Sequence, residues 1–241
     1  MQFTFIANFI IMKTFLLFPV VLMLTMTMLA QEPQTVMLDN NKVSVKDISP
    51  ELQFLFPEFQ NGHVLLKDSR EINCMLNYNF LVDEMLYIDE NGKKMALANP
   101  LDIVRITMAN RLFITTNKGY FEVIERGAIS LVYKWKCHII EKGKEGALGI
   151  VTDAPSVYQM NQISFDSKSW KLDVDKEAQV SVEVIPYLKI KSKCIPIRAE
   201  KDFLKAFSAK RTEIRLYLEK NPVDYRKESD LRRLTKYCNS L

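Results

Sequence analysis

The sequence predicts a mainly β protein of the α+β class, in which an antiparallel meander forms a barrel or a curved sheet before a small helical segment. Two long stretches, 72–80 and 129–140, alternate in polarity with a period of two, which places every second side chain on one face of a strand. All seven glycines lie between Gly62 and Gly149 and separate short apolar runs, as turns do in a meander. After Pro196 the apolar period changes to 3.6, which predicts helices.

The N-terminal region predicts export. Lys13 precedes an apolar run with a small-residue exit, so we expect residues 1–30 to be a secretory signal peptide that is cleaved after Ala30. Met12 is an alternative true start of the chain. A retained transmembrane anchor is the competing interpretation, but Pro19 and the short run argue against a spanning helix of about 20 residues. The expected location is periplasmic or extracellular.

Residues 31–53 are expected to form a leader, and residues 54–198 an antiparallel β domain. The strongest hairpin signal is Asn91-Gly92, since Asn-Gly supplies the two positive φ angles of a type I′ turn. A long polar loop is expected at 141–175, which exceeds the roughly 12 to 15 residues that are common for ordered connections. The strands are expected near 64–66, 72–80, 84–88, 94–97, 103–107, 111–115, 120–124, 129–140, 180–184, 187–190 and 194–197.

Residues 199–241 are expected to form a helical C-terminal segment of three short helices. This segment has eleven Lys or Arg against seven Asp or Glu, a net charge of 11 − 7 = +4. A basic helical tail can contact an anionic membrane surface, whereas solvated helix faces are the alternative. Because acidic residues are interleaved with the basic ones, the charge gives no reason to expect a nucleic-acid partner.

Four cysteines, Cys74, Cys137, Cys194 and Cys238, lie in a chain that is expected to be exported, so disulfides are chemically permitted. Four cysteines allow three pairings. The favoured alternative is that Cys74 and Cys137, on the apolar faces of alternating strands, are buried thiols that act as small hydrophobes. No C-x-x-C spacing indicates a redox or zinc site.

The first candidate ligand site is a polar cluster of Asn77, Asn79 and Glu84 near a strand end. Asparagine is uncommon in strands, so its repetition at alternate positions is informative. Such a cluster can bind a sugar or a peptide through its amide and carboxylate groups. The alternative is a solvent-facing side of the strand followed by a capped turn.

The second candidate is aromatic. Tyr78, Phe80, Tyr133 and Trp135 fall on the apolar faces of the two long strands and are expected to lie inside the barrel or curved sheet. There they would line a ligand pocket or fill the core, and small barrels usually fill their interiors with side chains.

Catalytic and metal chemistry has few candidates. His63 and His138 are the two histidines of the chain. Cys137 and His138 are adjacent in a strand, so their side chains point to opposite faces and do not converge on a metal or a substrate. The sequence therefore predicts no catalytic residue, no metal site and no cofactor.

Several short motifs are spread over about residues 54–238. They are Phe59-x-x-Gly62-x-Val64, Leu76-Asn77-Tyr78-Asn79, Glu84-Met85-x-Tyr87, Asn99-Pro100, Arg111-x-Phe113, Phe203-Leu204-Lys205-Ala206-Phe207 and Ile214-x-x-Tyr217-Leu218. Together they resemble a recurrent set of uncharacterised exported β-rich proteins of Bacteroidetes-type bacteria. The resemblance implies an envelope or extracellular location and a shared fold, and it supplies no catalytic residues.

These observations predict an exported, non-catalytic binding or structural protein of the cell envelope, with another envelope protein as its expected partner. The first alternative is a β-barrel that binds a small apolar or sugar ligand. The second alternative is a hydrolytic enzyme.

Overall fold

The structure, a computed structural model, describes residues 34–37, 48–141, 157–159 and 177–241 of the chain. The predicted signal peptide, most of the predicted leader and most of the predicted loop at 141–175 lie outside the described residues. Among the described residues, no helix has both the length and the apolar character needed to cross a membrane.

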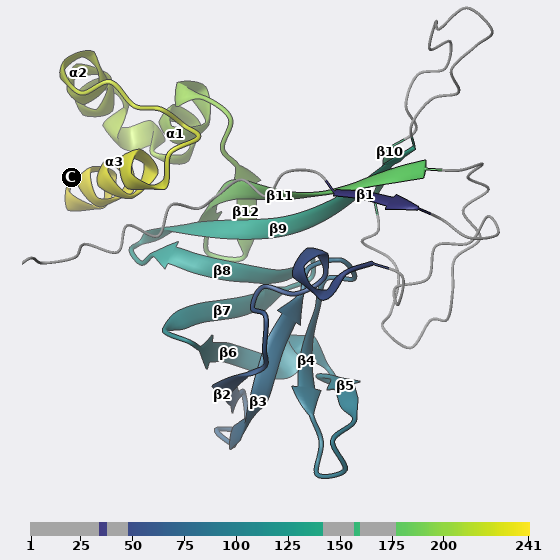
Figure 1. Cartoon of the computed structure of the whole chain (residues 1–241). Coiled ribbons are helices and arrows are strands. Elements are labelled where there is room, and N and C mark those ends of the chain that lie inside the picture. Colours follow the sequence, from purple (N-terminus) through teal and green to yellow (C-terminus); the bar gives the residue numbers. More distant parts are fainter. Residues whose placement is uncertain (1–33, 38–47, 142–156, 160–176) are drawn as a thin grey trace, which may run out of the picture. The chain divides into compact units, whose positions relative to one another are not determined.

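A twelve-stranded antiparallel sheet and a helical C-terminal segment make up the described part of the chain, which confirms the predicted fold class at this level (Figure 1). The strands are β1 (Gln34–Met37), β2 (Gln60–Leu66), β3 (Glu71–Asn79), β4 (Glu84–Ile88), β5 (Lys94–Ala96), β6 (Ile103–Met108), β7 (Arg111–Thr116), β8 (Gly119–Glu125), β9 (Ile129–Glu141), β10 (Val157–Gln159), β11 (Glu177–Ile190) and β12 (Lys193–Pro196). The helices are α1 (Glu200–Ala206), α2 (Arg211–Lys220) and α3 (Glu228–Ser240).

The strand order is β1-β11-β9-β8-β7-β6-β2-β3-β4-β5, with β10 added to β9 and β12 added to β11. Consecutive hairpins join β6 through β9 and β2 through β5, as the turn signals predict. The order departs from a simple meander at β2, which pairs with both β3 and β6. A short 3₁₀ turn, Pro100–Asp102, separates β5 from β6, and β6 then pairs with the free edge of β2.

The sheet folds back over its own inner face. The ring centroids of Tyr78 on β3 and Phe113 on β7 are 5.7 Å apart, although β2 and β6 lie between these strands. Since neighbouring strands are about 4.8 Å apart, three steps across a flat sheet would separate them by roughly 14 Å. Among the described strands, the hydrogen-bonded path ends at β1 and β5, which do not pair with each other.

Two main hydrophobic cores occupy this inner face. The first lies between the curled strands and includes Tyr78, Phe113 and Tyr120. The second lies between β8, β9, β11 and the helices, and its buried residues include Phe203 and Leu234. A smaller apolar cluster on the opposite face of the sheet consists of the buried residues Phe121, Val132 and Cys194.

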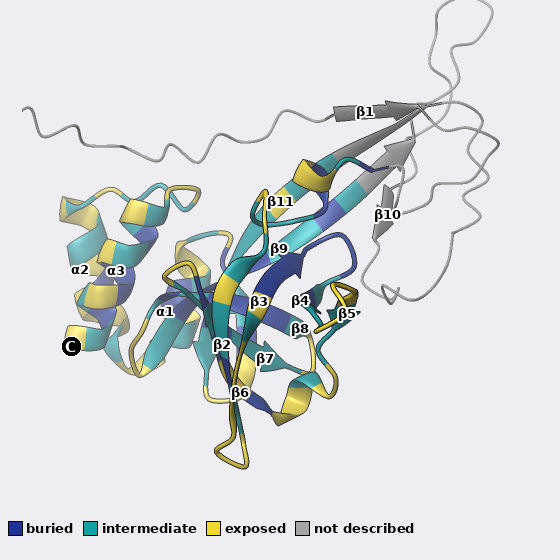
Figure 2. Ribbon diagram, turned by 60° about the horizontal axis from the view of Figure 1, so that its bottom comes forward, coloured by how far each residue is buried: buried dark blue, intermediate teal, exposed yellow. Residues whose placement is uncertain are grey.

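Strand β3 differs from its predicted one-sided pattern. Ile72 is 41% exposed, whereas Asn77 and Asn79 on the predicted polar face are 1% and 0% exposed. Burial changes along the strand rather than across it, from an exposed start to a fully buried end (Figure 2). The reason is that the preceding chain covers the end of β3: the N–H of Leu55 donates to the carbonyl of Tyr78 at 3.0 Å.

The last part of the predicted leader belongs to the first core. Ile48 and Leu52 are buried there, and the 3₁₀ turn Pro50–Leu52 positions them. Two further strands lie inside regions that were expected to be irregular. β1 pairs with β11 and β10 pairs with β9, because these two long strands extend past their other neighbours and leave edges to be paired.

The helices pack as the apolar stripes predict, with Ile214 and Leu231 buried in the second core. α3 is also fixed by polar contacts. The side chain of Asn239 accepts from the N–H of Ile129 at 3.0 Å and donates to its carbonyl at 2.8 Å. Arg232 donates to the carbonyl of Ile124. The last helix is therefore attached to both β8 and β9.

Candidate functional site

The predicted polar residues Asn77 and Asn79 form hydrogen bonds to the backbone. The Asn77 side chain accepts from the N–H of Phe56 at 3.2 Å and donates to its carbonyl at 2.8 Å. The Asn79 side chain accepts from the N–H groups of Leu81 and Val82 at 3.0 and 3.3 Å, which closes the turn after β3. Both amides are buried. The capped turn of the alternative interpretation is therefore present, but its solvent-facing side of the strand is wrong.

Glu84 begins β4 and lies opposite Asn79 in the β3–β4 ladder. It is partly exposed, whereas Asn77 and Asn79 are buried. The structure thus brings Asn79 and Glu84 into register, but it does not expose the three residues together on one surface.

Tyr78 is fully buried and takes part in an ion-pair network that sequence reasoning missed. Its hydroxyl donates to Oδ1 of Asp83 at 2.5 Å. Nζ of Lys134 donates to Oδ2 of Asp83 at 2.5 Å and to the carbonyls of Lys118 and Tyr120 at 2.9 and 3.2 Å. Burial lowers the pKa of Lys134, and the neighbouring Asp83 carboxylate opposes this effect. All three ammonium donors are used within the protein, so this lysine has a structural role.

Gly119 makes room for this ion pair. Its φ angle of +89° is in the region that favours glycine, and a Cβ at this position would clash with Oδ2 of Asp83. In the sequence, Lys134 is at one of the polar positions that alternate with apolar residues in β9. This pattern predicts a solvated side chain, whereas the structure buries it.

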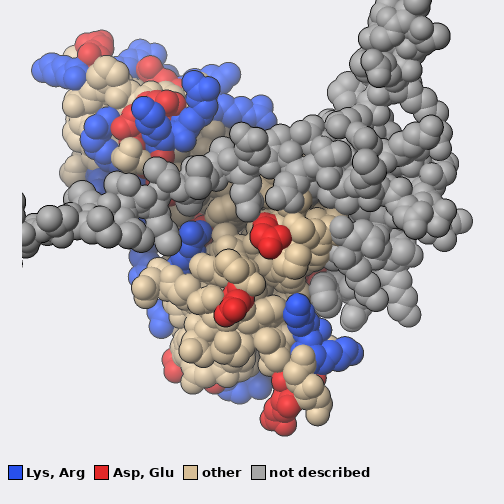
Figure 3. All heavy atoms as spheres, viewed as in Figure 1, with Lys and Arg blue, Asp and Glu red and all other residues tan. Residues whose placement is uncertain are grey.

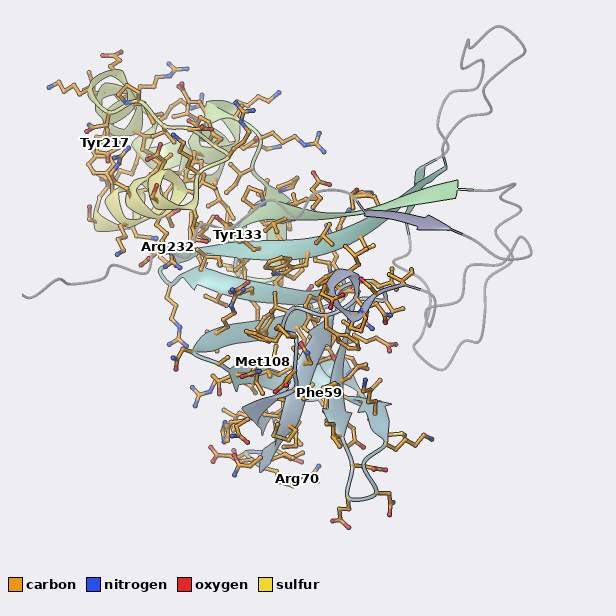
Figure 4. The ribbon with its side chains drawn as sticks, in the orientation of Figure 1. Phe59, Arg70, Met108, Tyr133, Tyr217 and Arg232 are labelled. Carbon is orange, nitrogen blue, oxygen red and sulfur yellow. The ribbon has the colours of Figure 1, made fainter. Side chains whose placement is uncertain are left out.

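The predicted aromatic pocket does not form as one unit. Phe80 stacks on Trp135 with ring centroids 6.1 Å apart in the first core. Tyr133 lies in the second core, beside Arg232 of α3 (Figure 4). Burial raises the pKa of Tyr133, as does the nearby carboxylate of Glu228, while Arg232 opposes the shift. Phe80 and Trp135 thus pack in the first core, and Tyr133 packs in the second.

A second buried polar group joins β7, β8 and β9. The carboxylate of Glu122 accepts from Nη1 of Arg111 at 3.2 Å and from Nε1 of Trp135 at 3.0 Å. The guanidinium of Arg111 also lies 5.5 Å from the ring centroid of Phe56. Burial raises the pKa of Glu122, and Arg111 opposes this shift. In the sequence, the buried position of Glu122 is indicated by its alternation with the inward-facing Tyr120 and Ile124 of β8.

An open hollow of about 650 Å³ lies between the β7–β8 turn and the β11–β12 hairpin. We call it the lysine groove. Its described lining contains four lysines and no Asp, Glu or Arg. The lining residues are Thr115, Thr116, Asn117, Lys118, Lys189, Lys191, Ser192, Lys193, Cys194 and Ile195.

The lysine groove lies on the outer face of the sheet, beside the small apolar cluster. Cys194 packs in this cluster, where the ring of Phe121 meets that of Tyr187 edge to face at 5.3 Å. Burial raises the pKa of the Cys194 thiol, while the neighbouring charges of Lys189 and Lys118 oppose the shift. Packing in the apolar cluster stabilises the part of the groove that Cys194 lines.

The groove lysines are free of ion pairs with other described residues. Nζ of Lys189 donates to the carbonyl of Lys191 at 2.8 Å. Lys118, Lys191 and Lys193 form no salt bridge within the described part of the chain, and all three are exposed. In the sequence, Lys189, Lys191 and Lys193 are predicted to form a solvated strand edge. Lys191 and Lys193 are exposed, in agreement with this prediction, and all three lysines line a hollow together with Lys118 of another hairpin.

The two histidines pair with carboxylates. Nε2 of His63 lies 3.1 Å from Glu71, and Nε2 of His138 lies 2.8 Å from Glu183. His63 also lines a shallow hollow of about 590 Å³ near the β6–β7 turn. Across the part of the chain that the structure describes, no group of three or more His, Cys, Asp and Glu residues could hold a metal ion.

All four cysteines are free. Cys137 is a buried thiol as predicted, whereas Cys74 is only partly buried. Burial raises the pKa of Cys137 to about 12, so this thiol is a poor nucleophile at neutral pH.

Comparisons with protein-family models, with curated proteins and with solved structures find no match for this chain.

Proposed function

We propose that the chain is an exported, non-catalytic binding protein of the cell envelope, and that it holds its partner at the lysine groove. The observation that carries this proposal is the concentration of four lysines, none of them paired with a described carboxylate, around one open hollow. Clustered charge of one sign in a concave site raises the local concentration of oppositely charged partners. The volume of about 650 Å³ is also within the range of small-molecule sites.

Export is supported by the signal-peptide layout of residues 1–30 and by the resemblance to exported proteins of Bacteroidetes-type bacteria. Membership of that set is part of the proposal.

The non-catalytic character is supported by the bonding of the buried polar side chains. Lys134 uses its three donors within the protein, and Glu122 accepts from Arg111 and Trp135. Asn77 is bound to the backbone of Phe56. These groups stabilise the sheet and are not aimed at a site where a substrate could react.

A barrel around an apolar or sugar ligand has less support. Tyr78, Phe80 and Trp135 pack against other core residues, so they offer little room for a ligand. We propose instead that the sheet is curved and open, with its inner face filled by side chains and by the helices. Binding would then take place on the outer face.

The basic helical tail is also a weaker candidate for contact with a membrane. Acidic and basic side chains are interleaved on it (Figure 3). Arg232 pairs with Glu228 at 2.7 Å, and Arg233 pairs with Asp230 at 3.2 Å. These ion pairs reduce the net positive field of the helices. The groove lysines, in contrast, form no ion pair with a described carboxylate.

The test is affinity capture from the native envelope with three forms of the full chain. These are the wild type, the groove variant Lys118→Gln/Lys193→Gln, and a control variant Lys67→Gln/Lys93→Gln that loses the same charge at exposed positions outside the groove. We expect the wild type and the control to retain the same envelope component and the groove variant to lose it. Equal retention by all three would refute the groove as the binding site.

Export has its own test. Cell fractionation followed by mass determination of the purified chain should find a mature protein that begins at Gln31 outside the cytoplasm. A cytoplasmic protein that keeps residues 1–30 would contradict the proposal.

A further inference from the structure

We propose that the lysine groove binds phosphate groups, at least two at a time, with one held by each hairpin. This inference rests on the proposed function and adds the chemistry of the ligand. The phosphates could belong to a soluble oligophosphate or to neighbouring lipid headgroups, which present the same chemistry to the protein.

The first argument is the type of cation in the groove. Its described basic residues are lysines, without arginine. The guanidinium of arginine is a planar fork that matches carboxylates and phosphates alike, whereas the lysine ammonium is a compact point charge with three donors that rotate freely. A tetrahedral phosphate offers oxygens in several directions, so it can accept from several such ammonium groups at once.

The second argument is the division of the charge between two hairpins. Lys118 stands on the β7–β8 turn, while Lys189, Lys191 and Lys193 stand on the β11–β12 hairpin. A hollow of about 650 Å³ lies between the two hairpins. A ligand with two or more anionic groups can contact lysines of both hairpins at once, which raises its affinity over that of a single phosphate.

Neutral donors lie beside the lysines. Asn117 and Ser192 are exposed at the tips of the two turns, and both line the groove. Their amide and hydroxyl groups can donate to phosphate oxygens. Each hairpin therefore supplies a positive charge together with a neutral donor.

The third argument is that the backbone of the groove is already fixed. The hydroxyl of Thr115 donates to the carbonyl of Ile103 at 3.1 Å, and the hydroxyl of Thr116 accepts from the N–H of Lys118 at 3.0 Å. The buried ammonium of Lys134 donates to the carbonyl of Lys118 at 2.9 Å. A preformed backbone loses less conformational entropy on binding, so the ordering cost is confined mainly to the lysine side chains.

The test is calorimetric titration of the full chain with inorganic orthophosphate, pyrophosphate and tripolyphosphate. We expect affinity to increase along this series and to fall as salt is added, because screening weakens exposed charge pairs. The groove variant Lys118→Gln/Lys193→Gln should bind tripolyphosphate roughly tenfold more weakly, and the control variant Lys67→Gln/Lys93→Gln should match the wild type.

A second arm separates the two sources of phosphate. Vesicles of phosphatidylcholine alone are compared with an equimolar mixture of phosphatidylcholine and phosphatidylglycerol in sedimentation assays. Binding to the mixed vesicles that the groove variant loses, and that tripolyphosphate competes away, assigns the phosphates to lipid headgroups. Binding of tripolyphosphate without vesicle binding assigns them to a soluble ligand.

The two proposals can fail separately. If the groove variant loses a captured envelope component for which no phosphate probe competes, the phosphate assignment is wrong and the binding function stands. If all three forms bind every probe and every component equally, both proposals are wrong. Equal affinity for orthophosphate and tripolyphosphate would also overturn the two-phosphate site.

Discussion

At the residue scale, the polar side chains that look like ligand-binding groups in the sequence are largely structural. Asn77 and Asn79 bind backbone groups, and Tyr78 donates to Asp83. Their alternation on a strand predicts one buried and one solvated face, but a segment before β2 covers the second face. A sequence pattern cannot show this covering segment, because the contact joins residues far apart in the chain.

Asn77→Ala tests the structural role of this amide. It should lower the free energy of unfolding by about 1–3 kcal/mol, since it leaves buried backbone groups of Phe56 without partners. Capture of the envelope component should be unchanged in the folded variant. Denaturant unfolding and affinity capture give the two readouts, and loss of capture with full stability would return Asn77 to the binding site.

Gly119→Ala tests the space that the ion pair of Asp83 and Lys134 requires. A methyl group at φ +89° both strains the backbone and displaces the carboxylate, so we expect a loss of about 2–4 kcal/mol of stability. Gly92→Ala is the matched control, because Gly92 has a similar φ of +78° with nothing within 4 Å of the added Cβ. Equal losses in the two variants, measured by urea unfolding, would show that backbone strain alone accounts for the effect.

Glu122 makes the stability depend on pH. Burial raises its pKa in the folded chain above the ordinary value of 4.5, so above pH 4.5 the folded state binds more protons than the unfolded state. The contribution of this group is fully present below its unfolded pKa and is lost as the pH rises through its folded pKa. The stability of the wild type relative to Glu122→Gln should therefore fall from pH 4.5 towards neutrality.

Urea unfolding of both forms across this pH range measures the difference, with Glu219→Gln at an exposed position of α2 as the control. A difference that stays constant or rises with pH would contradict the assigned shift.

At the element scale, the sequence predicts what local signals determine. The hairpin at Asn91-Gly92 forms, but the predicted type I′ turn is wrong, because Gly92 has a positive φ and Asn91 does not. The ends of β4, β6 and β7 fall within a few residues of their predicted places. The pairing of β2 with β6 has no local signal, because it joins strands separated by three intervening strands in the chain. The lysine groove cannot be predicted from the sequence for the same reason, since Lys118 and Lys189 belong to different hairpins.

Helix α3 offers a prediction at this scale. Asn239→Ala removes both hydrogen bonds to Ile129, so α3 should exchange its amide hydrogens faster while β2 to β7 keep their protection. Asn221→Ala is the control, because the Asn221 amide bonds to Tyr217 within its own helix region. Uniformly faster exchange over the whole chain would instead indicate that α3 does not open as a separate unit.

At the scale of the whole described molecule, the two faces of the sheet have different uses. The inner face is filled by two cores and holds the helices, which leaves little room for a ligand. The outer face has a small apolar cluster with the lysine groove beside it. The aromatic residues that suggested a binding barrel thus stabilise the fold. The proposed binding surface includes Lys189, Lys191 and Lys193, which the sequence pattern assigns to a solvated edge.

The most direct measurement is site-specific photo-crosslinking in cells that express the protein. A photoreactive residue at Ser192 lies in the groove, and one at Thr212 lies on the exposed side of α2. We predict an envelope adduct at position 192 that is absent at position 212 and that disappears when Lys118→Gln/Lys193→Gln is added. Adducts of equal yield at both positions, or an adduct at 212 alone, would contradict binding at the lysine groove.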